Sequence, residues 1–204
     1  GEKTYSTKNP LSEKFRTEIA PAWHDFPHAA EKTLQENGIK IRFFEVANME
    51  KDAYAIKVTE NGVLVSAGGY EGLCGAFQTF LKILDATTDS IRCMEIEDAP
   101  DCKVRAFHLD LSVYNYKIEY VRNILDKLAA LKYDAVIIDY RGMFPYSLPY
   151  ASAFYGYSKE QVSRMVAYAK RLGITMIPLL PVLRSVNFIW ELEPYIWLSD
   201  LPEV

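Results

Sequence analysis

Six side chains suited to binding a polar ligand follow three apolar segments of the sequence. They are Asp110, Asp139, Tyr140, Arg141, Tyr146 and Arg184. Carboxylates and guanidinium groups form strong hydrogen bonds with polar ligands, and a tyrosine ring offers an apolar face with a hydroxyl at its end. If the three segments are parallel strands, these side chains lie at their carboxyl ends, where barrel enzymes place their active sites. We therefore take the six residues as candidate substrate-binding residues and assign no catalytic residue.

The elements that would position these residues alternate between strand and helix. The near-continuous apolar runs 104–112, 134–140 and 174–180 predict strands that are buried on both faces. The segments 118–132 and 158–173 repeat apolar residues every three to four positions, which predicts helices, the second capped by Ser158 and ended by Gly173. This alternation predicts parallel strands with right-handed crossovers. A doubly wound sheet and a (β/α) barrel both satisfy the pattern.

The N-terminal half, 1–97, is expected to form a separate α+β unit. Its patterns predict helices at 28–38 and 70–85 and strands at 39–47, 53–60, 63–67 and 91–97. Asn61-Gly62 indicates a tight hairpin turn between two of these strands. The polar segment before residue 24, broken by Pro10 and Pro21, is expected to be irregular with one short helix.

Four blocks of sequence carry a family resemblance. They are IEDAPDCKVRAFHLDLS (96–112), LAALKYDAVIIDY (128–140), IIDYRGMFPY (137–146) and YSKEQVSRMVAYAKRLGITMIP (157–178). In this order they resemble glycoside hydrolase family 20, the β-N-acetylhexosaminidases, and within it the hexosaminidase D-like branch. The resemblance implies an α/β chain in which a small α+β domain (1–97) precedes the first three β/α units of a TIM-type barrel (98–204), incomplete in this chain.

The resemblance also implies an activity and its catalytic groups. Family 20 enzymes cleave terminal N-acetylhexosamine from glycans with assistance from the 2-acetamido group, an exception to the usual two-carboxylate scheme. An Asp-Glu pair that ends the fourth barrel strand supplies the general acid and orients the acetamido group. This chain stops at Val204, after its third predicted strand, and Glu97-Asp98 precedes the first, so we interpret that step as structural. The chain alone is expected to be inactive.

Three further positions depart from the family pattern. Val113 stands where the family has a sugar-binding Arg, Gly142 stands where the hexosaminidase D-like branch has an Asp, and Arg184-Ser185 replaces a Gly-His pair. Two hypotheses follow. The chain is the N-terminal portion of a family 20-like glycosidase without its Asp-Glu pair, or it is a non-catalytic carbohydrate-binding or scaffolding module of that fold. A third, a doubly wound nucleotide binder, requires a Gly-rich turn after the first strand, which 112–116 does not contain.

Composition limits the partners. The chain has 204 residues and a net charge of −4 without a basic stripe, which argues against nucleic acid. Its apolar runs are of strand length, so no membrane span is expected. The three cysteines match no metal or redox motif and are interpreted as buried small hydrophobic residues. We expect no cofactor and no metal, and a glycan or amino sugar as partner. The chain begins at Gly1, which is compatible with export and leaves the compartment open.

Several candidates have simpler structural interpretations. Asp110 could be a buried carboxylate that holds a loop, and Asp139 with Arg141 could be a surface ion pair worth ~0.2–1 kcal/mol. His108 is interpreted as a core histidine, and Arg105 as a structural residue at the start of the first strand.

The last expectation concerns the edge of the incomplete barrel. Three strands cannot close a barrel, and a bare apolar edge is an association site. We expect the C-terminal segment 187–204, rich in aromatic residues, to fold back over the sheet, or a second copy to dock there as a homodimer, or both.

Overall fold

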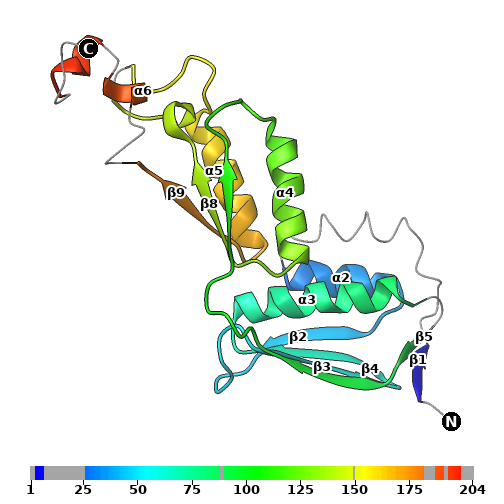
Figure 1. Ribbon diagram of the computed structural model, residues 1–204. Helices are drawn as coiled ribbons and strands as arrows, with labels where there is room; N and C mark the ends of the chain where they lie inside the picture. Colours follow the sequence, from blue (N-terminus) through cyan, green and yellow to red (C-terminus); the bar gives the residue numbers. More distant parts are fainter. Residues whose placement is uncertain are drawn as a thin grey trace. The chain divides into compact units, whose positions relative to one another are not determined.

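The computed structural model of the protein describes residues 3–6, 26–87, 90–148, 150–181, 187–190 and 193–198. These residues group into two compact units (Figure 1). The first unit comprises Gly1–Val104 with the short segments Ala129–Lys132 and Arg171–Gly173. The second comprises Arg105–Leu128, Tyr133–Lys170 and Ile174–Val204. The described residues form an α/β fold with a mixed sheet, a parallel sheet and a short two-stranded antiparallel sheet.

The first unit is built on a four-stranded sheet with the order β2-β4-β3-β6. Its strands are β2 (Ile41–Glu45), β3 (Tyr54–Thr59), β4 (Gly62–Ala67) and β6 (Met94–Asp98). The strand β2 runs parallel to β4, whereas β3 is antiparallel to both of its neighbours. Buried and more exposed residues alternate along β2, β3 and β4, as expected when one face of a sheet is covered.

Two helices, α2 (His28–Glu36) and α3 (Tyr70–Asp85), cover that face of the sheet (Figure 1). The helix α3 has the predicted limits and buries Leu73, Phe77, Phe80 and Leu84. Gly72 allows this helix to approach the sheet closely, because a Cβ at this position would lie 2.5 Å from the carbonyl oxygen of Ala53.

The prediction of one strand over 91–97 was wrong. The segment forms two short strands in different sheets, β5 (Ser90–Arg92) and β6, separated at Cys93. The strand β5 pairs with β1 (Thr4–Ser6), and the amide of Cys93 donates a hydrogen bond to the carbonyl of Lys3. This pairing with a distant segment, which the sequence pattern did not indicate, divides the apolar run. The rest of the segment before residue 24 lies outside the described residues.

The interpretation of all three cysteines as buried was also wrong. All three are thiols, but only Cys74 is buried, whereas Cys93 is half-buried and Cys102 is exposed. Burial raises the pKa of the Cys74 thiol to about 12. Cys74 is therefore protonated at neutral pH and behaves as the small hydrophobic residue that the sequence predicted.

The outer edge of β2 is covered by side chains of α2. The backbone amide of Phe43 donates a hydrogen bond to Glu31 Oε1, and Gln35 Nε2 donates one to the carbonyl of Ile41 over 3.1 Å. Among the described strands β2 pairs with β4 alone, so these two backbone groups face the open edge of the sheet. Occupied edge groups cannot pair with another chain, so α2 protects this edge from association.

We expect Glu31→Ala to lower the free energy of unfolding by about 1–2 kcal/mol, because it leaves the amide of Phe43 without its acceptor. Denaturant titration of the full chain measures the change. Glu36→Ala is the matched control on the same helix. Glu36 is exposed, and its Oε1 lies 4.0 Å from Lys32 Nζ. Removing this exposed pair should lower the free energy of unfolding by less than about 0.5 kcal/mol. Equal losses in the two variants would contradict a specific role for Glu31.

The second unit contains three parallel strands in the order β7-β8-β9, as the alternation of strand and helix predicted. They are β7 (Ala106–Asp110), β8 (Ala135–Asp139) and β9 (Thr175–Leu179), and the helices α4 (Ile118–Ala130) and α5 (Lys159–Arg171) follow the first two. The predicted cap of α5 is confirmed, because Ser158 Oγ accepts a hydrogen bond from the amide of Gln161 over 3.1 Å.

The two faces of this sheet differ in what covers them. Leu109 and Ile138 lie opposite each other in the register and are buried. On the other face lie His108, Ile137 and Ile177, of which His108 is exposed and Ile177 is 42% exposed. Within the described residues, the strands of this unit are therefore not buried on both faces, contrary to the expectation from their apolar runs.

Short elements lie beyond these strands. They are η2 (Arg141–Met143), α6 (Asn187–Trp190) and η3 (Glu193–Leu198). Phe188 of α6 packs on Tyr146, with ring centroids 5.9 Å apart, and lies beside Gly142. This part of the C-terminal segment therefore contacts the loop after β8. Among the described residues, no helix is both long and apolar enough to span a membrane.

Candidate functional site

The register of the parallel sheet places the ends of its three strands side by side. Asp110 ends β7, Asp139 ends β8 and Leu179 ends β9, and the three are direct neighbours across the sheet. Two of the predicted site residues, Asp110 and Asp139, therefore lie on the same face of the sheet and at the same edge. Polar loops that follow parallel strands converge at this edge.

Asp139 and Arg141 form an ion pair in which Arg141 Nε lies 3.3 Å from Asp139 Oδ2. The side chain of Asp139 is only 7% exposed, whereas that of Arg141 is 43% exposed. The interpretation as a surface ion pair was therefore wrong, because the carboxylate is buried. Its second oxygen, Oδ1, is buried without a hydrogen-bond partner among the described residues. A buried acceptor of this kind is costly unless a donor satisfies it.

Asp110 holds the turn that follows β7. Its Oδ1 accepts hydrogen bonds from the amide of Ser112 over 2.8 Å and from the hydroxyl of Ser112 over 2.6 Å. These bonds from Ser112 hold the pKa of Asp110 below its ordinary value. The carboxylate is exposed, so the interpretation of Asp110 as a buried group was wrong, although it does hold a loop.

Tyr140 and Tyr146 differ in their surroundings. Tyr140 is 3% exposed and packs against the rings of Phe144 and Tyr157, and burial raises its pKa. It is a core residue in this unit. Tyr146 is half-buried between Phe144 and Phe188. Burial raises the pKa of Tyr146 and the negative charge of Asp139 raises it further, which places the ring within the field of the buried carboxylate.

The remaining sequence candidates fall in different places. Arg184 lies outside the described residues. His108 is exposed on the uncovered face of the sheet, so the interpretation as a core histidine was wrong. Arg105 pairs with Asp134, with 3.1 Å between Arg105 Nη2 and Asp134 Oδ2, at the opposite, amino-terminal end of the strands. That contact agrees with its interpretation as a structural residue.

Two residues of the site were missed from the sequence. Phe188 contributes an aromatic ring beside Tyr146, and Ser112 fixes the carboxylate of Asp110. The Asp-x-Ser spacing is a turn signal that could have identified Ser112. Phe188 had no such signal, because its contact depends on a segment that returns from far along the chain.

The loops near this edge carry exposed aromatic residues and a polar cleft. Tyr114 and Tyr155 are 65% and 63% exposed, and Asn115 joins the two loops by a hydrogen bond to the carbonyl of Tyr155. A cleft of about 500 Å³ opens beside the first turns of α4 and α5 and is lined by polar residues that include Lys117, Arg122 and Gln161. Among the described residues, no group of His, Cys, Asp and Glu could hold a metal ion. The site therefore offers carboxylates, a guanidinium group and aromatic faces, which suit a polar ligand with apolar patches.

Comparison with known families assigns the first unit. Residues 4–99 match the family model described as glycosyl hydrolase family 20, domain 2. Over these residues the chain is similar to the second domain of glycoside hydrolase family 20. The resemblance inferred from the four sequence blocks is therefore confirmed.

Individual hexosaminidases are similar to the chain in sequence or in fold. A β-hexosaminidase from Vibrio furnissii is 24% identical over 159 residues, which are 64% of this chain and 26% of that protein. Human hexosaminidase D is 29% identical over 101 residues, 48% of this chain and 21% of that protein. The crystal structure of a β-N-acetylhexosaminidase from Bacteroides fragilis has a TM-score of 0.68 at 20% identity and covers 84% of this chain and 42% of that one. The chain thus spans about a quarter of the length of the curated relatives and less than half of this solved structure.

Proposed function

We propose that this chain is the N-terminal portion of a family 20-like glycoside hydrolase that acts on terminal N-acetylhexosamine residues of glycans. In this proposal residues 1–97 form the small domain and residues 98–204 form the first three β/α units of a TIM-type barrel. The uncovered face of the sheet, with His108, Ile137 and Ile177, would become the barrel interior. Three parallel strands in sequential order, separated by helices, support this arrangement.

The observation that carries the proposal is the pairing of Asp110 and Asp139 at the carboxyl ends of adjacent parallel strands. Asp139 keeps one buried oxygen without a partner among the described residues, which suits a donor such as a sugar hydroxyl. The stacked rings of Tyr146 and Phe188 lie beside the same loop. Aromatic faces favour contact with the apolar face of a pyranose ring.

This geometry supports a proposed substrate-binding group. Asp110, Asp139, Arg141 and Tyr146 form it, and Arg184 is assigned to it from the sequence. Tyr140, which is buried, positions the loop and does not contact the sugar. These residues bind and orient the sugar, through its burial inside the barrel and its hydrogen bonds with Asp139. They take no part in bond cleavage.

The 204 residues alone are proposed to bind but not to hydrolyse. The strands end in the steps Asp110-Leu111, Asp139-Tyr140 and Leu179-Leu180, and none of these is the Asp-Glu pair on which the family's substrate-assisted reaction depends. A general acid and an acetamido-orienting carboxylate must act together, so binding without this pair gives no turnover.

A second candidate is a non-catalytic carbohydrate-binding or scaffolding module with the same site. The exposed apolar residues of β9 and beyond favour a surface that associates, since Leu179 and Leu180 are 39% and 54% exposed. An apolar cavity of about 200 Å³ lies between α5 and the strands β8 and β9. Either further barrel units or a second copy of the chain would cover this edge.

Retention on immobilised N-acetylglucosamine tests the proposed site. We expect the full chain to be retarded, and Tyr146→Ala to elute at the void volume because it removes one of the two stacked rings. Tyr168→Ala, on α5, is the matched aromatic control and should be retarded like the parent. We also expect no turnover of a chromogenic N-acetylglucosaminide. Turnover by the chain alone, or equal retention of both variants, would overturn the proposal.

A further inference from the structure

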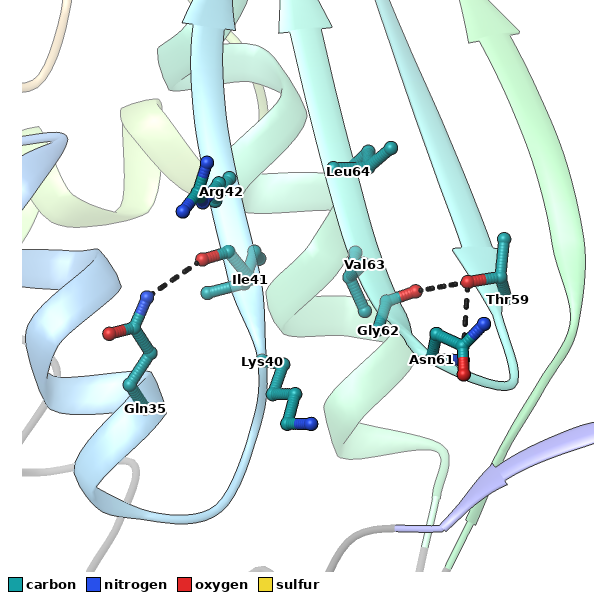
Figure 2. A pocket seen from close by; sticks show the side chains of 9 residues that line it. All are labelled: Gln35, Lys40, Ile41, Arg42, Thr59, Asn61, Gly62, Val63 and Leu64. Carbon is teal, nitrogen blue, oxygen red and sulfur yellow. Dashed lines mark hydrogen bonds between the residues drawn. The ribbon is translucent and has the colours of Figure 1, made fainter.

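A second cavity lies in the first unit, on the four-stranded sheet. It has a volume of about 370 Å³, which is within the range of small-molecule sites. Figure 2 shows that its lining comes from the end of α2, from the edge strand β2 and from the hairpin between β3 and β4. The lining residues are Gln35, Lys40, Ile41, Arg42, Thr59, Asn61, Gly62, Val63 and Leu64.

The charged residues of this cavity are all positive. Lys40 and Arg42 line it, and no Asp or Glu of the described residues does. None of the ion pairs formed by the described residues includes Lys40 or Arg42. The chain as a whole carries a net charge of −4, so this positive cavity is a local feature. Unpaired cations in a hollow attract an anionic ligand.

The walls of the cavity are held in place by hydrogen bonds. Gln35 Nε2 bonds the carbonyl of Ile41 over 3.1 Å, and Thr59 Oγ1 donates to the carbonyl of Gly62 over 3.1 Å and accepts from the amide of Asn61 over 3.3 Å (Figure 2). Gly62 has a φ of +147°, a backbone conformation that favours glycine. A side chain at this position would clash with the wall of the cavity, because its Cβ would lie 2.7 Å from the carbonyl oxygen of Lys40. The cavity is thus preformed, which lowers the cost of binding.

The other lining groups limit the chemistry of the ligand. Leu64 is 45% exposed and offers an apolar surface, and the side-chain amides of Gln35 and Asn61 offer polar contacts. Within the described part of the chain no aromatic residue lines the cavity, so a nucleobase would find no ring there on which to stack. The lining suits a ligand that combines an oxyanion, hydroxyl groups and an apolar face.

We propose that this cavity binds an acidic sugar, meaning a sugar unit that carries a carboxylate or a sulfate ester. The oxyanion pairs with Lys40 and Arg42, the hydroxyl groups meet the amides of Gln35 and Asn61, and the apolar face of the ring lies against Leu64. All residues that line this cavity belong to the first unit. A negative result for this cavity would leave the proposed function of the second unit untouched.

Amide NMR spectra of the ¹⁵N-labelled full chain, titrated with glucuronic acid and with N-acetylglucosamine 6-sulfate, test this site. We expect saturable shifts in the amides of residues 40–42 and 61–64. Arg42→Gln should weaken binding by roughly tenfold, because it removes a charge-assisted hydrogen bond. Lys57→Gln is the matched control, since Lys57 lies two strands from β2 and pairs with Glu95. It should leave the affinity unchanged.

Three results would overturn the proposal. The first is the absence of shifts in these amides with either acidic sugar. The second is binding of glucose, the neutral counterpart of glucuronic acid, with the same affinity, which would remove the role of the two cations. The third is inorganic sulfate binding as tightly as the sulfated sugar, which would show that the cavity recognises an oxyanion alone.

Discussion

Replacing Phe77 by alanine is expected to lower the free energy of unfolding by about 3–5 kcal/mol, the range for removing a large buried aromatic residue. Phe77 is 1% exposed in the core of the first unit. Its ring lies 5.3 Å from that of Phe26 and 5.9 Å from that of Phe43, measured between centroids. The truncation would remove contacts that the helix α3 makes through this ring with Phe26 and with Phe43 of the sheet. Denaturant titration of the full chain, with amide exchange read in β3 and β4, measures the loss.

Phe44→Ala is the matched control for this prediction. Phe44 follows Phe43 on the same strand but points to the other face of the sheet and is 45% exposed. Its truncation should cost less than about 1 kcal/mol. If the two alanine variants lost the same stability, the assignment of the two faces of this sheet would be wrong.

Replacing Arg141 by methionine is expected to destabilise the second unit by about 1–3 kcal/mol. Its partner Asp139 has a side chain that is only 7% exposed, so the variant leaves a buried carboxylate without its cation. The loss stays below that of a fully buried pair because Arg141 itself is 43% exposed. Amide exchange in β8 reports the change in the full chain.

The double variant Asp139→Asn/Arg141→Met distinguishes the cost of an unpaired buried carboxylate from other effects of losing the Arg141 side chain. It removes the buried charge together with its partner, so we expect it to recover part of the stability that Arg141→Met loses. Arg164→Met removes a cation from the exposed pair with Glu160 and should cost less than about 0.5 kcal/mol. A double variant less stable than Arg141→Met would contradict the account of a buried, compensated carboxylate.

The sequence predicted the local elements of the second unit well, because their signals are local. The strand ends at Asp110 and Asp139 lie within two residues of the predicted ends, and Ser158 caps the helix that was expected there. Apolar runs and capping residues depend only on neighbours in sequence. The same reasoning located α3 to the residue.

The features that were missed depend on contacts between distant segments. The pairing of β1 with β5 divides a run that looked continuous, and no periodicity in 91–97 indicates it. The burial of Asp139 likewise depends on the loop after β8, where Arg141 covers the carboxylate. A short Asp-x-Arg spacing fits an exposed pair as well as a buried one. Sequence patterns therefore predicted which residues lie at the strand ends without giving their environment.

The most direct test of the proposed glycan site is a titration of the ¹⁵N-labelled full chain with N-acetylglucosamine, followed by amide NMR. The site is placed at the carboxyl ends of β7 and β8, so we predict saturable shifts at Ser112 and across residues 139–146. Residues at the opposite ends of these strands, Arg105 and Asp134, should not shift. Shifts confined to the first unit, or no saturable shift at residues 139–146, would contradict the placement of an amino-sugar site at the strand ends.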